Sequence, residues 1–473
     1  MRFSIAIPHL VVLASVWLRS VSSLPDSSSP AGGGDPPVDD DFMMIRDVAI
    51  IGGGASGTYA SVRLREQNRS VVLIEREDHL GGHTRTYYDP NGTPIDYGVW
   101  VYTDTPEARW FFGHFNIPFG RQIFNRNPVG SQRIDFRTGE RVPPPSGNLT
   151  EAMMRYVQVL LQYPYLDSGW DLPYPVPEDL LMPFREFIEK YDLGPAVETL
   201  TLYVQGFADI LNYPTVYILK YFNFNVVRGI QDGFLRPLSQ ANADLYNAAR
   251  EELGDDVLLS STVARIDRSD SGPHRILVRT PMGTKYIEAD KLIVTIPPLP
   301  DILNNFDLDA LEQRLFGRFN FSGYYTSVVN IPNYPNNTQI INKGADTLYN
   351  IATLPGTYIF IPTQVTDLAV GYVGGGPGYS YQDTIVEIIH QNARSLRAAG
   401  INIGDPEIRA FGDHAPFGLF VPAEDIAAGF YRGLYSLQGH RNTWYTGAAW
   451  HCHDSGGLWS FTENLLNEHV LSS

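Results

Sequence analysis

A glycine-rich turn near the start of the chain restricts the fold more than any other feature of the sequence. Residues 47–51 read DVAII and lead directly into Gly52, Gly54 and Gly57, which have the spacing G-x-G-x-x-G. A short, continuous apolar run is typical of a strand that is buried on both faces of a parallel sheet. In such a turn the first glycine permits the sharp bend, the second lets the backbone approach a pyrophosphate, and the third lets a helix pack closely on the strand.

The residues after the glycines complete a βαβ unit. Residues 55–66 have the apolar spacing of a helix, and residues 70–74, SVVLI, predict a second buried strand that ends at Glu75. The helix would begin at Ala55 and Ser56, and its free N–H groups and positive dipole end would face phosphates. Glu75 follows the glycines at the distance where an acid binds the ribose of a dinucleotide. The sequence therefore predicts a Rossmann-type α/β fold that binds a dinucleotide.

From Glu75 onward the chain resembles the flavin amine oxidase superfamily, whose members carry an acid followed by a glycine pair and bind FAD. Residues 75–86 read EREDHLGGHTRT, with the pair at Gly81 and Gly82. Residues 289–298, ADKLIVTIPP, closely match a strand of that superfamily, and residues 444–457, WYTGAAWHCHDSGG, stand at its closing FAD motif. The resemblance extends over nearly the whole chain after the first forty residues and is strongest before residue 101.

Three further segments have counterparts in the superfamily. Residues 94–102 look like the strand that passes under the flavin ring, residues 233–253 like the helix before the second FAD segment, and residues 257–267 like the strand whose valine meets the adenine. The resemblance and the turn together imply FAD as the cofactor. The implied contacts are Gly52, Gly54, Ala55, Ser56, Gly57, Glu75, Arg76, Gly81, Gly82, His83, Thr84, Tyr97, Gly98, Val99, Trp100, Val263, Gly447, His451, Cys452, Gly456 and Gly457.

The resemblance also implies two interleaved domains. A Rossmann-type FAD-binding domain of the GR2, amine-oxidase-like kind would be built from residues 45–110, 226–298 and 425–473. A mixed α+β substrate-binding domain would be built from residues 111–225 and 299–424, which are rich in aromatic residues and proline. The substrate cavity would lie between the domains, at the flavin face.

The sequence departs from the amine oxidases at three points that concern the chemistry. Many amine oxidases place a lysine near the flavin N5, but residues 322–332, SGYYTSVVNIP, contain none, and Lys343 is the nearest downstream. Gly447 is followed by alanines at positions 448–449, where an acid is usual, and Gly457 stands where a tyrosine of the amine-binding cage is common. These departures argue against ordinary amine oxidation.

The closing motif contains a run of four polar residues, His451, Cys452, His453 and Asp454. Neighbouring side chains point in different directions, so four consecutive residues rarely converge on one metal ion, and we predict no metal site. Contact with the flavin and packing under its ring are the two remaining interpretations. Cys452 is the only cysteine, which excludes an intrachain disulfide and any all-thiolate metal site.

Related enzymes attach their flavin through a cysteine or a histidine at the 8α-methyl group. Three residues of this chain are candidates for such a bond: His83 beside the glycine pair, His414 in the segment GDHAPFG, and Cys452. A non-covalent flavin is the alternative. The sequence leaves this choice open.

The first residues predict passage through a secretory compartment. Residues 1–23 contain Arg2, a mostly apolar run and small residues at the cleavage positions, as in a signal peptide, although a retained signal anchor is the alternative. Residues 24–44 are mainly Ser, Pro, Gly and Asp, so we predict a disordered linker. We expect a secreted or luminal, N-glycosylated protein, because five Asn-x-Ser/Thr sequons occur, at Asn68, Asn91, Asn148, Asn320 and Asn336.

The composition bears on the partners. The net charge of −17 argues against a nucleic-acid partner, because binding to phosphates needs clustered positive charge. No later segment approaches the roughly twenty apolar residues of a membrane span, so we expect no membrane contact beyond the signal peptide. The expected partner is a small-molecule substrate, and the sequence does not predict an oligomeric state.

The signal peptide, the segment GGHTRTYY and the site without lysine together most resemble the β-cyclopiazonate dehydrogenase family, which oxidises an indole-containing tetramic acid and closes rings in secondary metabolism. The resemblance implies an FAD-dependent dehydrogenase or oxidocyclase that removes a hydride from a C–H bond of a small aromatic metabolite. His83, Tyr325 and His453 are candidates for the catalytic proton transfer.

Two other functions stay open. A secreted amine or L-amino-acid oxidase would release hydrogen peroxide, and Arg228 or Arg318 would bind the carboxylate of an amino acid. A flavin-binding protein without catalytic activity is the third interpretation, because the lysine and the acid of the amine oxidases are missing.

Overall fold

The computed structural model describes residues 43–123, 130–270, 272–376 and 382–472. The predicted signal peptide and residues 24–42 of the predicted linker lie outside the described residues. Residues 43 and 44, also assigned to the linker, belong instead to the first strand, because they pair with Tyr286 and Ile287 of a later strand. The pairing extends the strand beyond the apolar run that identified it.

The strands are β1 (Met43–Ile51), β2 (Val71–Ile74), β3 (Thr86–Tyr88), β4 (Pro94–Asp96), β5 (Phe119–Gln122), β6 (Gln132–Ile134), β7 (Phe234–Pro237), β8 (Val257–Leu258), β9 (Thr262–Asp267), β10 (His274–Thr280), β11 (Gly283–Val294), β12 (Asn320–Asn330), β13 (Ile340–Asn342), β14 (Gly356–Pro362), β15 (Leu368–Gly375), β16 (Glu407–Asp413), β17 (Phe417–Phe420) and β18 (Thr443–Tyr445). The helices are α1 (Ala55–Glu66), α2 (Pro106–His114), α3 (Leu149–Leu160), α4 (Glu178–Leu181), α5 (Phe184–Lys190), α6 (Val197–Tyr203), α7 (Thr215–Tyr221), α8 (Phe224–Asp232), α9 (Ala243–Leu253), α10 (Ala310–Phe316), α11 (Gln382–Ala398), α12 (Ala423–Ala427), α13 (Phe430–Tyr435) and α14 (Ser455–Leu465).

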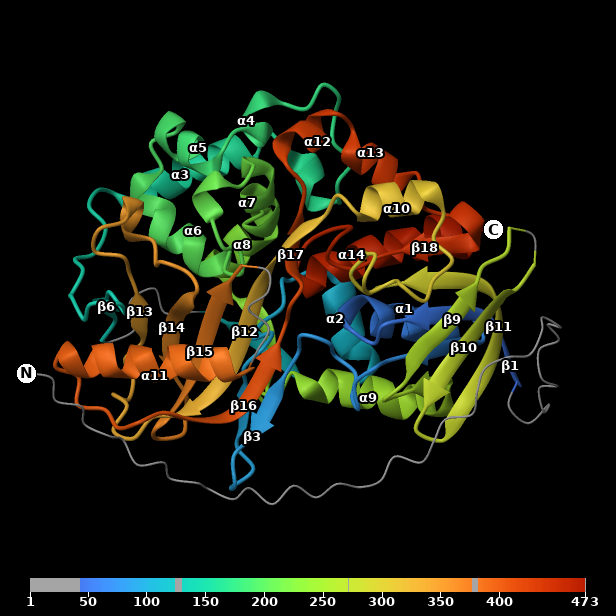
Figure 1. Cartoon of the computed structure of the whole chain (residues 1–473), viewed down its shortest axis with the longest axis horizontal. Coiled ribbons are helices and arrows are strands. Elements are labelled where there is room, and N and C mark those ends of the chain that lie inside the picture. The colour runs from blue at the N-terminus through green and yellow to red at the C-terminus, as the bar shows by residue number, and fades with distance from the viewer. Residues whose placement is uncertain (1–42, 124–129, 271, 377–381, 473) are drawn as a thin grey trace, which may run out of the picture. The chain divides into compact units, whose positions relative to one another are not determined.

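The first sheet confirms the Rossmann-type fold. Its order is β8-β2-β1-β11-β10-β9, and β18 pairs with the carboxyl-terminal end of β11. The pairs β8–β2, β2–β1, β1–β11 and β11–β18 are parallel, whereas β9 and β10 form an antiparallel extension. Figure 1 shows α1 and α14 beside this sheet, and their side chains share one apolar cluster with β1 and β2. The carboxyl ends of β1, β2 and β11 therefore meet at one edge, where ligands bind in open α/β sheets.

Three segments differ from their sequence prediction. Residues 257–267 form two strands at opposite edges of the sheet, because the chain turns after Leu258 and re-enters as β9. Within residues 94–102 only β4 is a strand. Residues 233–253 begin with β7, and their helix starts at Ala243. Apolar patterning indicated order in these segments but not where one element ends.

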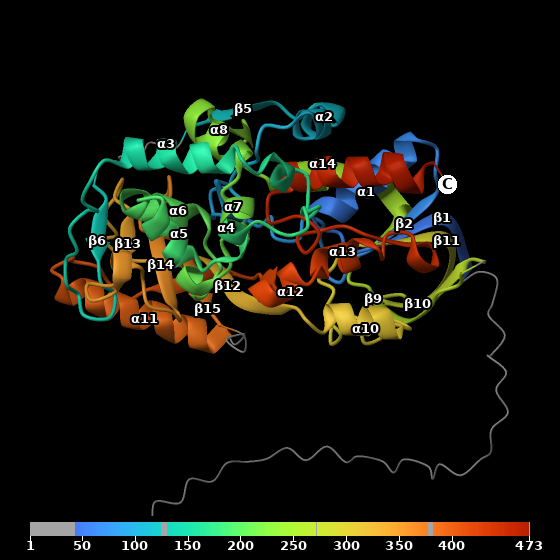
Figure 2. The ribbon, with the colours of Figure 1, turned by 90° about the horizontal axis from the view of Figure 1, so that it is seen from above.

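The second sheet has the order β16-β12-β15-β14-β13-β6, with β17 paired to β12. Its strands lie in residues 132–134 and 320–420, and most of its pairs are antiparallel. Figure 2 shows α11 on one side of this sheet and helices α3 to α8 on the other. Consecutive residues of β12 therefore face different layers: Tyr325 lies in the cluster with α11, and Tyr324 faces the helical layer.

Predicted domain limits at residues 110, 225 and 424 fall inside α2, α8 and α12. The exact limits of the two interleaved domains therefore stay a prediction. In addition, β5 and β7, which we assigned to different domains, pair with one another.

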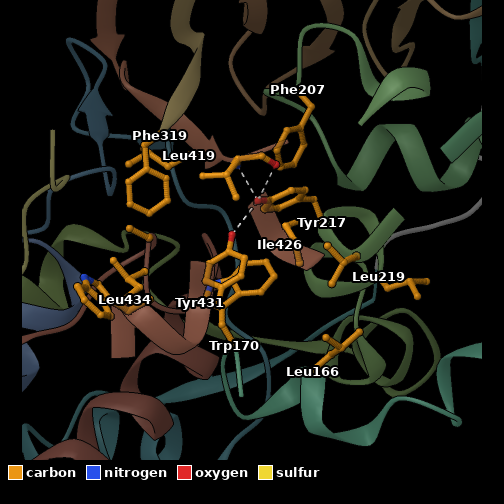
Figure 3. Close-up of a cluster of buried hydrophobic side chains, with 14 of the residues drawn as sticks. Leu166, Trp170, Phe207, Tyr217, Leu219, Phe319, Leu419, Ile426, Tyr431 and Leu434 are labelled. Carbon is orange, nitrogen blue, oxygen red and sulfur yellow. Dashed lines mark hydrogen bonds between the residues drawn. The ribbon is translucent and has the colours of Figure 1, made fainter. Parts of the chain in front are cut away.

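The helical layer packs around an aromatic core. Trp170 stacks on Tyr431 with ring centroids 4.3 Å apart, and the hydroxyl groups of Tyr217 and Tyr431 lie 2.8 Å apart (Figure 3). The backbone N–H of Val421 also donates to the Tyr217 hydroxyl, at 2.8 Å. These bonds satisfy buried tyrosine hydroxyls, which would otherwise be costly to bury. No helix in the described part of the chain is long and apolar enough to cross a membrane.

Candidate functional site

The glycine-rich turn has the geometry that its sequence predicts. Gly52 has φ +105°, a conformation that favours glycine, and its N–H donates to the carbonyl of Ile74 on β2 at 2.8 Å. A Cβ atom at Gly57 would lie 1.8 Å from the carbonyl oxygen of Gly52. Gly57 therefore brings α1 onto the turn and does not line the pocket described below.

The space above the turn fits a phosphate group. Gly54 is the N-cap of α1, and a Cβ atom built there would meet only the Cα of Gly82, at 3.9 Å. Gly81 and Gly82 both have positive φ and form the opposite wall. The Ser56 hydroxyl is buried and has no hydrogen-bond partner among the described residues. The first turn of α1 carries no acid, so its dipole and free N–H groups favour an anion here.

Glu75 lies at the end of β2, as predicted, and is buried. Its carboxylate accepts hydrogen bonds from the N–H of Gly53 at 2.6 Å and from the N–H of Glu77 at 2.8 Å. These bonds hold the carboxylate beside the turn and on the pocket wall. This is the place where the βαβ unit presents an acid to a ribose.

A pocket with a volume of about 520 Å³ runs from Glu75 past the turn. Of the predicted cofactor contacts, it is lined by Gly52, Gly54, Ala55, Ser56, Glu75, Arg76, Gly81, Gly82, His83, Thr84, Val99, Val263 and Gly447. The volume is in the range of pockets that enclose organic ligands. The pocket, the unpartnered Ser56 hydroxyl and the open Gly54 cradle together fit a dinucleotide.

The other predicted contacts do not line the pocket: Gly57, Tyr97, Gly98, Trp100, His451, Cys452, Gly456 and Gly457. The glycines among them allow close packing. A Cβ at Gly98 would lie 1.9 Å from the His83 carbonyl oxygen, and one at Gly456 would lie 2.2 Å from the Thr103 hydroxyl. The Trp100 indole donates to the Asp96 carbonyl at 2.6 Å. Packing gives a structural reason for these residues, and their contact with a cofactor stays a prediction.

Within the run from His451 to Asp454, the side chains point in two directions, some away from the pocket and some into it. The His451 ring lies 2.9 Å from the Asp167 carbonyl oxygen and 3.1 Å from the Cys452 sulfur, and both residues are buried away from the pocket. The His453 side chain lines the pocket instead.

Of the three candidates for covalent attachment, His83 and His414 line the pocket and Cys452 does not. Among the described residues no group of three or more His, Cys, Asp or Glu side chains is arranged to hold a metal ion.

Three histidines meet at the end of the pocket. The His83 ring lies 5.3 Å from the His453 ring and 4.5 Å from the His414 ring. The Gly418 N–H donates to Nε2 of His453 at 3.2 Å, which leaves the His453 proton on Nδ1. His414 Nε2 lies 2.9 Å from the Thr326 hydroxyl, and its Nδ1 has no partner among the described residues.

Burial keeps these three imidazoles neutral. It lowers the pKa of His83 to about 4, assisted by the nearby charges of Arg85 and Arg76. Burial, together with the neighbouring histidines, lowers the pKa of His414 and His453 well below the ordinary value. A neutral imidazole has one ring nitrogen with a free lone pair, so these rings can accept hydrogen bonds at neutral pH, and the same burial makes them weak bases.

The structure does not bring Tyr325 to the histidines. Tyr325 stacks on Phe411 with centroids 6.2 Å apart, in the apolar cluster under α11. Its neighbour Tyr324 faces the other way, and its ring lies 6.1 Å from His414 and 4.8 Å from Phe417. Successive side chains of β12 point to opposite faces of the sheet, so only one of these two tyrosines can face the histidines. The sequence predicted the strand but not which of its residues face the pocket.

Several pocket residues escaped the sequence analysis. Thr295 follows β11, and its hydroxyl donates to the carbonyls of Ile51 and Gly52 at 3.0 and 2.9 Å. Asp413 precedes His414, and burial raises its pKa. Thr295 and Asp413 belong to the segments IVTIPP and GDHAPFG, both of which the sequence analysis singled out. The polar residues of these segments could therefore have been predicted as pocket residues. The further lining residues include Ser261, Thr262, Asn305, Pro416, Thr446, Ala448, Ala449 and Ser455.

Comparison with known proteins agrees with this geometry. Residues 50–115 match the family model of the NAD(P)-binding Rossmann-like domain. The chain is 36% identical to beta-cyclopiazonate dehydrogenase of Aspergillus oryzae over 436 residues, which cover 90% of this chain and 93% of that protein. It is 39% identical to the FAD-dependent oxidoreductase dbaF of Emericella nidulans over 434 residues, which cover 89% and 91%.

Solved structures share the fold at lower identity. A fatty acid isomerase from P. acnes that produces CLA superposes with a TM-score of 0.72 at 20% identity, covering 89% of this chain and 98% of that one. Putrescine oxidase superposes with a TM-score of 0.64 at 16% identity, covering 91% and 100%. The fold is therefore that of the flavin amine oxidases, and the sequence identities over nine-tenths of the chain give the family. The chain belongs to the FAD-dependent oxidoreductases that include beta-cyclopiazonate dehydrogenase.

Proposed function

We propose that this oxidoreductase removes a hydride from a C–H bond of a small, flat, aromatic secondary metabolite and that the oxidised product closes a ring. The observation that carries the proposal is the end of the pocket. Three neutral histidines, of which His414 is buried and His83 and His453 are half-buried, lie there beside aromatic rings, and β12 supplies no lysine at this place. Flat aromatic surfaces favour a flat aromatic ligand.

FAD, when bound, supplies the two-electron acceptor for the hydride. The protein holds it through the Gly54 cradle, the first turn of α1 and Glu75. Hydride loss leaves an electron-poor centre, and a proton must then leave the substrate if a neutral product is to form. His453 already accepts a hydrogen bond at Nε2, so we assign the proton acceptor to His83, whose ring lines the same end of the pocket.

Ring closure requires the substrate to be held in a folded shape. An aromatic cavity that excludes water lets a double bond or a carbon nucleophile lie close to the electron-poor carbon before water reaches it. The relatives named beta-cyclopiazonate dehydrogenase support a substrate of this kind, because their name states a metabolite as the compound oxidised.

An absorbance spectrum followed by anaerobic titration tests the proposal. We expect the two visible bands of oxidised flavin, and we expect them to bleach with a prenylated indole metabolite but not with simple amines or amino acids. Bleaching by amines or amino acids, with peroxide formed on admission of air, would establish the oxidase alternative. Flavin that no candidate bleaches would favour a binding protein, and absence of the bands would reject the flavin site itself.

The arginines that an amino-acid oxidase would need do not reach the pocket. Arg228 donates to Asn225 on the exposed side of α8, at 2.7 Å. Arg318 lies 3.9 Å from Asp425 with 60% of its side chain exposed. The pocket wall contains neither residue. This arrangement favours the metabolite over an amino acid.

We also propose that the protein is secreted, or luminal, and N-glycosylated. All five sequon asparagines are exposed, as glycan attachment requires. After expression through a eukaryotic secretory pathway, we expect the protein in the medium and a drop in mass on treatment with an N-glycosidase. Replacing each sequon asparagine with glutamine should remove one glycan at a time. Protein retained in the cell at its unmodified mass would reject the proposal.

A further inference from the structure

The histidine end of the pocket is closed by a buried aromatic ring, that of Phe417. Phe417 on β17 stacks on His453 with ring centroids 3.8 Å apart and an angle of 12° between the rings. Its centroid lies 5.8 Å from His83 and 4.8 Å from Tyr324. Phe417 therefore fills a slot between His453, on which it stacks, and Tyr324, whose ring is tilted by 42°, directly behind the wall of the pocket.

A reciprocal pair of glycines and aromatic rings builds this closure. Phe417 lies against Gly206, where a Cβ would be 2.3 Å from the ring. Phe207 lies in turn against Gly418, where a Cβ would be 3.0 Å from its ring (Figure 3 shows Phe207). Two glycines thus leave room for two rings, one from each side. The contact joins the segment after α6 to strand β17.

The segment around Gly206 is held mainly by side-chain hydrogen bonds. Gln205 accepts from the Tyr324 hydroxyl at 3.1 Å, the Gly206 N–H donates to the Tyr358 hydroxyl at 3.3 Å, and the Ala208 N–H donates to the Ser322 hydroxyl at 3.3 Å. On its far side lies a small cavity of about 40 Å³, lined by Gln205, Phe207 and Tyr358 among others. The Phe417 ring therefore lies between this cavity and the large pocket.

FAD and the substrate together need more volume than the large pocket offers. The pocket begins at the glycine turn and extends along residues assigned to the dinucleotide, and its other end is packed with histidine and aromatic side chains. We propose that the substrate's flat ring binds in the slot that Phe417 fills, stacked on His453, and that Phe417 thereby determines which substrates the enzyme accepts. This inference rests on the proposed function, because it places the substrate of that reaction.

Indole binding to the purified holoenzyme tests the inference. Phe417→Ala empties the slot, whose walls are the rings of His453, His83 and Tyr324, so a flat aromatic ligand can stack there in place of the phenylalanine. We expect Phe417→Ala to bind indole at least about tenfold more tightly than the wild type, because no ring must first leave the slot. The binding is followed as a change in the visible flavin spectrum. Phe417→Trp should weaken the binding.

Two controls separate this slot from a general loosening of the fold. Phe411→Ala removes a half-buried phenylalanine ring beside Tyr325, on the other face of the second sheet, and indole should leave its flavin spectrum as in the wild type. Octahydroindene, a neutral bicycle of similar size that is not flat, should bind Phe417→Ala no better than it binds the wild type. If Phe417→Ala does not fold, Phe417→Leu takes its place. It is expected to bind indole more tightly than the wild type, with a smaller gain than that predicted for Phe417→Ala.

The outcomes distinguish the inference from the proposed function. If Phe417→Ala or Phe417→Leu keeps its flavin and binds indole no better than the wild type, the slot is not the substrate site. Equal gains in Phe411→Ala would also overturn it. A wild-type protein without flavin bands would reject the proposed function instead.

Discussion

Replacing Gly54 with valine is expected to remove the flavin while leaving the apoprotein folded. Gly54 has φ −72°, which any residue adopts, and a Cβ there meets only the Cα of Gly82, at 3.9 Å. The valine methyl groups would then fill the gap between Gly54 and Gly82, where the pyrophosphate is expected. We expect FAD affinity to fall by at least about 100-fold, which corresponds to about 2.7 kcal/mol. Flavin absorbance per protein after gel filtration, together with the thermal unfolding of the apoprotein, measures both effects.

Two other glycines provide matched controls. Gly57→Val places its Cβ 1.8 Å from the carbonyl oxygen of Gly52, so it should lower the stability of the apoprotein as well as remove the flavin. Gly113 in α2 has nothing within 4 Å of its added Cβ, so Gly113→Ala should keep the flavin and leave stability equal or slightly higher. Full flavin content in Gly54→Val would show that the phosphates lie elsewhere.

The difference between these glycines also shows what the sequence could predict. The end of the pocket that holds the glycines is local, because one strand, one turn and one helix build it within a short stretch of chain. The spacing of Gly52, Gly54 and Gly57 therefore predicted its shape, and Glu75 lies where the βαβ unit requires. At Gly98 the structure adds a packing reason for glycine, because a Cβ there would lie 1.9 Å from the His83 carbonyl oxygen, and the predicted contact with the cofactor stays a prediction.

The histidine end could not be derived in the same way. His83, His414 and His453 come from three segments that are far apart in the sequence, and only the packing of two sheets brings their rings together. The sequence singled out each histidine separately, by its position in a motif, and did not predict that the three rings meet. Tyr325 was predicted and Tyr324 was not, because the sequence alone does not fix which face of β12 points inward. Register across a sheet is a tertiary property.

A buried ion pair joins the first sheet to α10. Arg268 follows β9, and both its side chain and that of Glu312 are fully buried. The guanidinium donates to both carboxylate oxygens of Glu312, at 2.6 Å each, and Nε donates to Asp307 at 2.8 Å. The Tyr445 hydroxyl of β18 adds a bond to Glu312 at 2.7 Å. Such a network satisfies every partner only while all of them are present.

Glu312→Ala should therefore cost about 3–5 kcal/mol of unfolding free energy, because it leaves Arg268 buried without its bidentate partner. The change also removes the capping box at the start of α10, in which the Asp309 N–H donates to Glu312. Urea unfolding of the wild type and of Glu312→Ala at pH 7 measures the difference in unfolding free energy. Glu387→Ala, which breaks an exposed pair with Arg394, should change stability by less than about 1 kcal/mol. An equally small effect in Glu312→Ala would contradict the argument.

The pair also makes a prediction about pH. The contact with Arg268 holds the pKa of Glu312 below its ordinary value of 4.5, although burial alone would raise it. A carboxyl whose pKa is lower in the folded state contributes stability above its unfolded pKa and loses that contribution as pH falls through the folded value. The gap between the wild type and Glu312→Ala should therefore be full above about pH 5 and shrink in more acidic solution. The double variant Arg268→Met, Glu312→Leu removes both charges, so it should regain most of the stability at pH 7. A gap that stays constant down to pH 3 would show that Glu312 acts by packing and not by its charge.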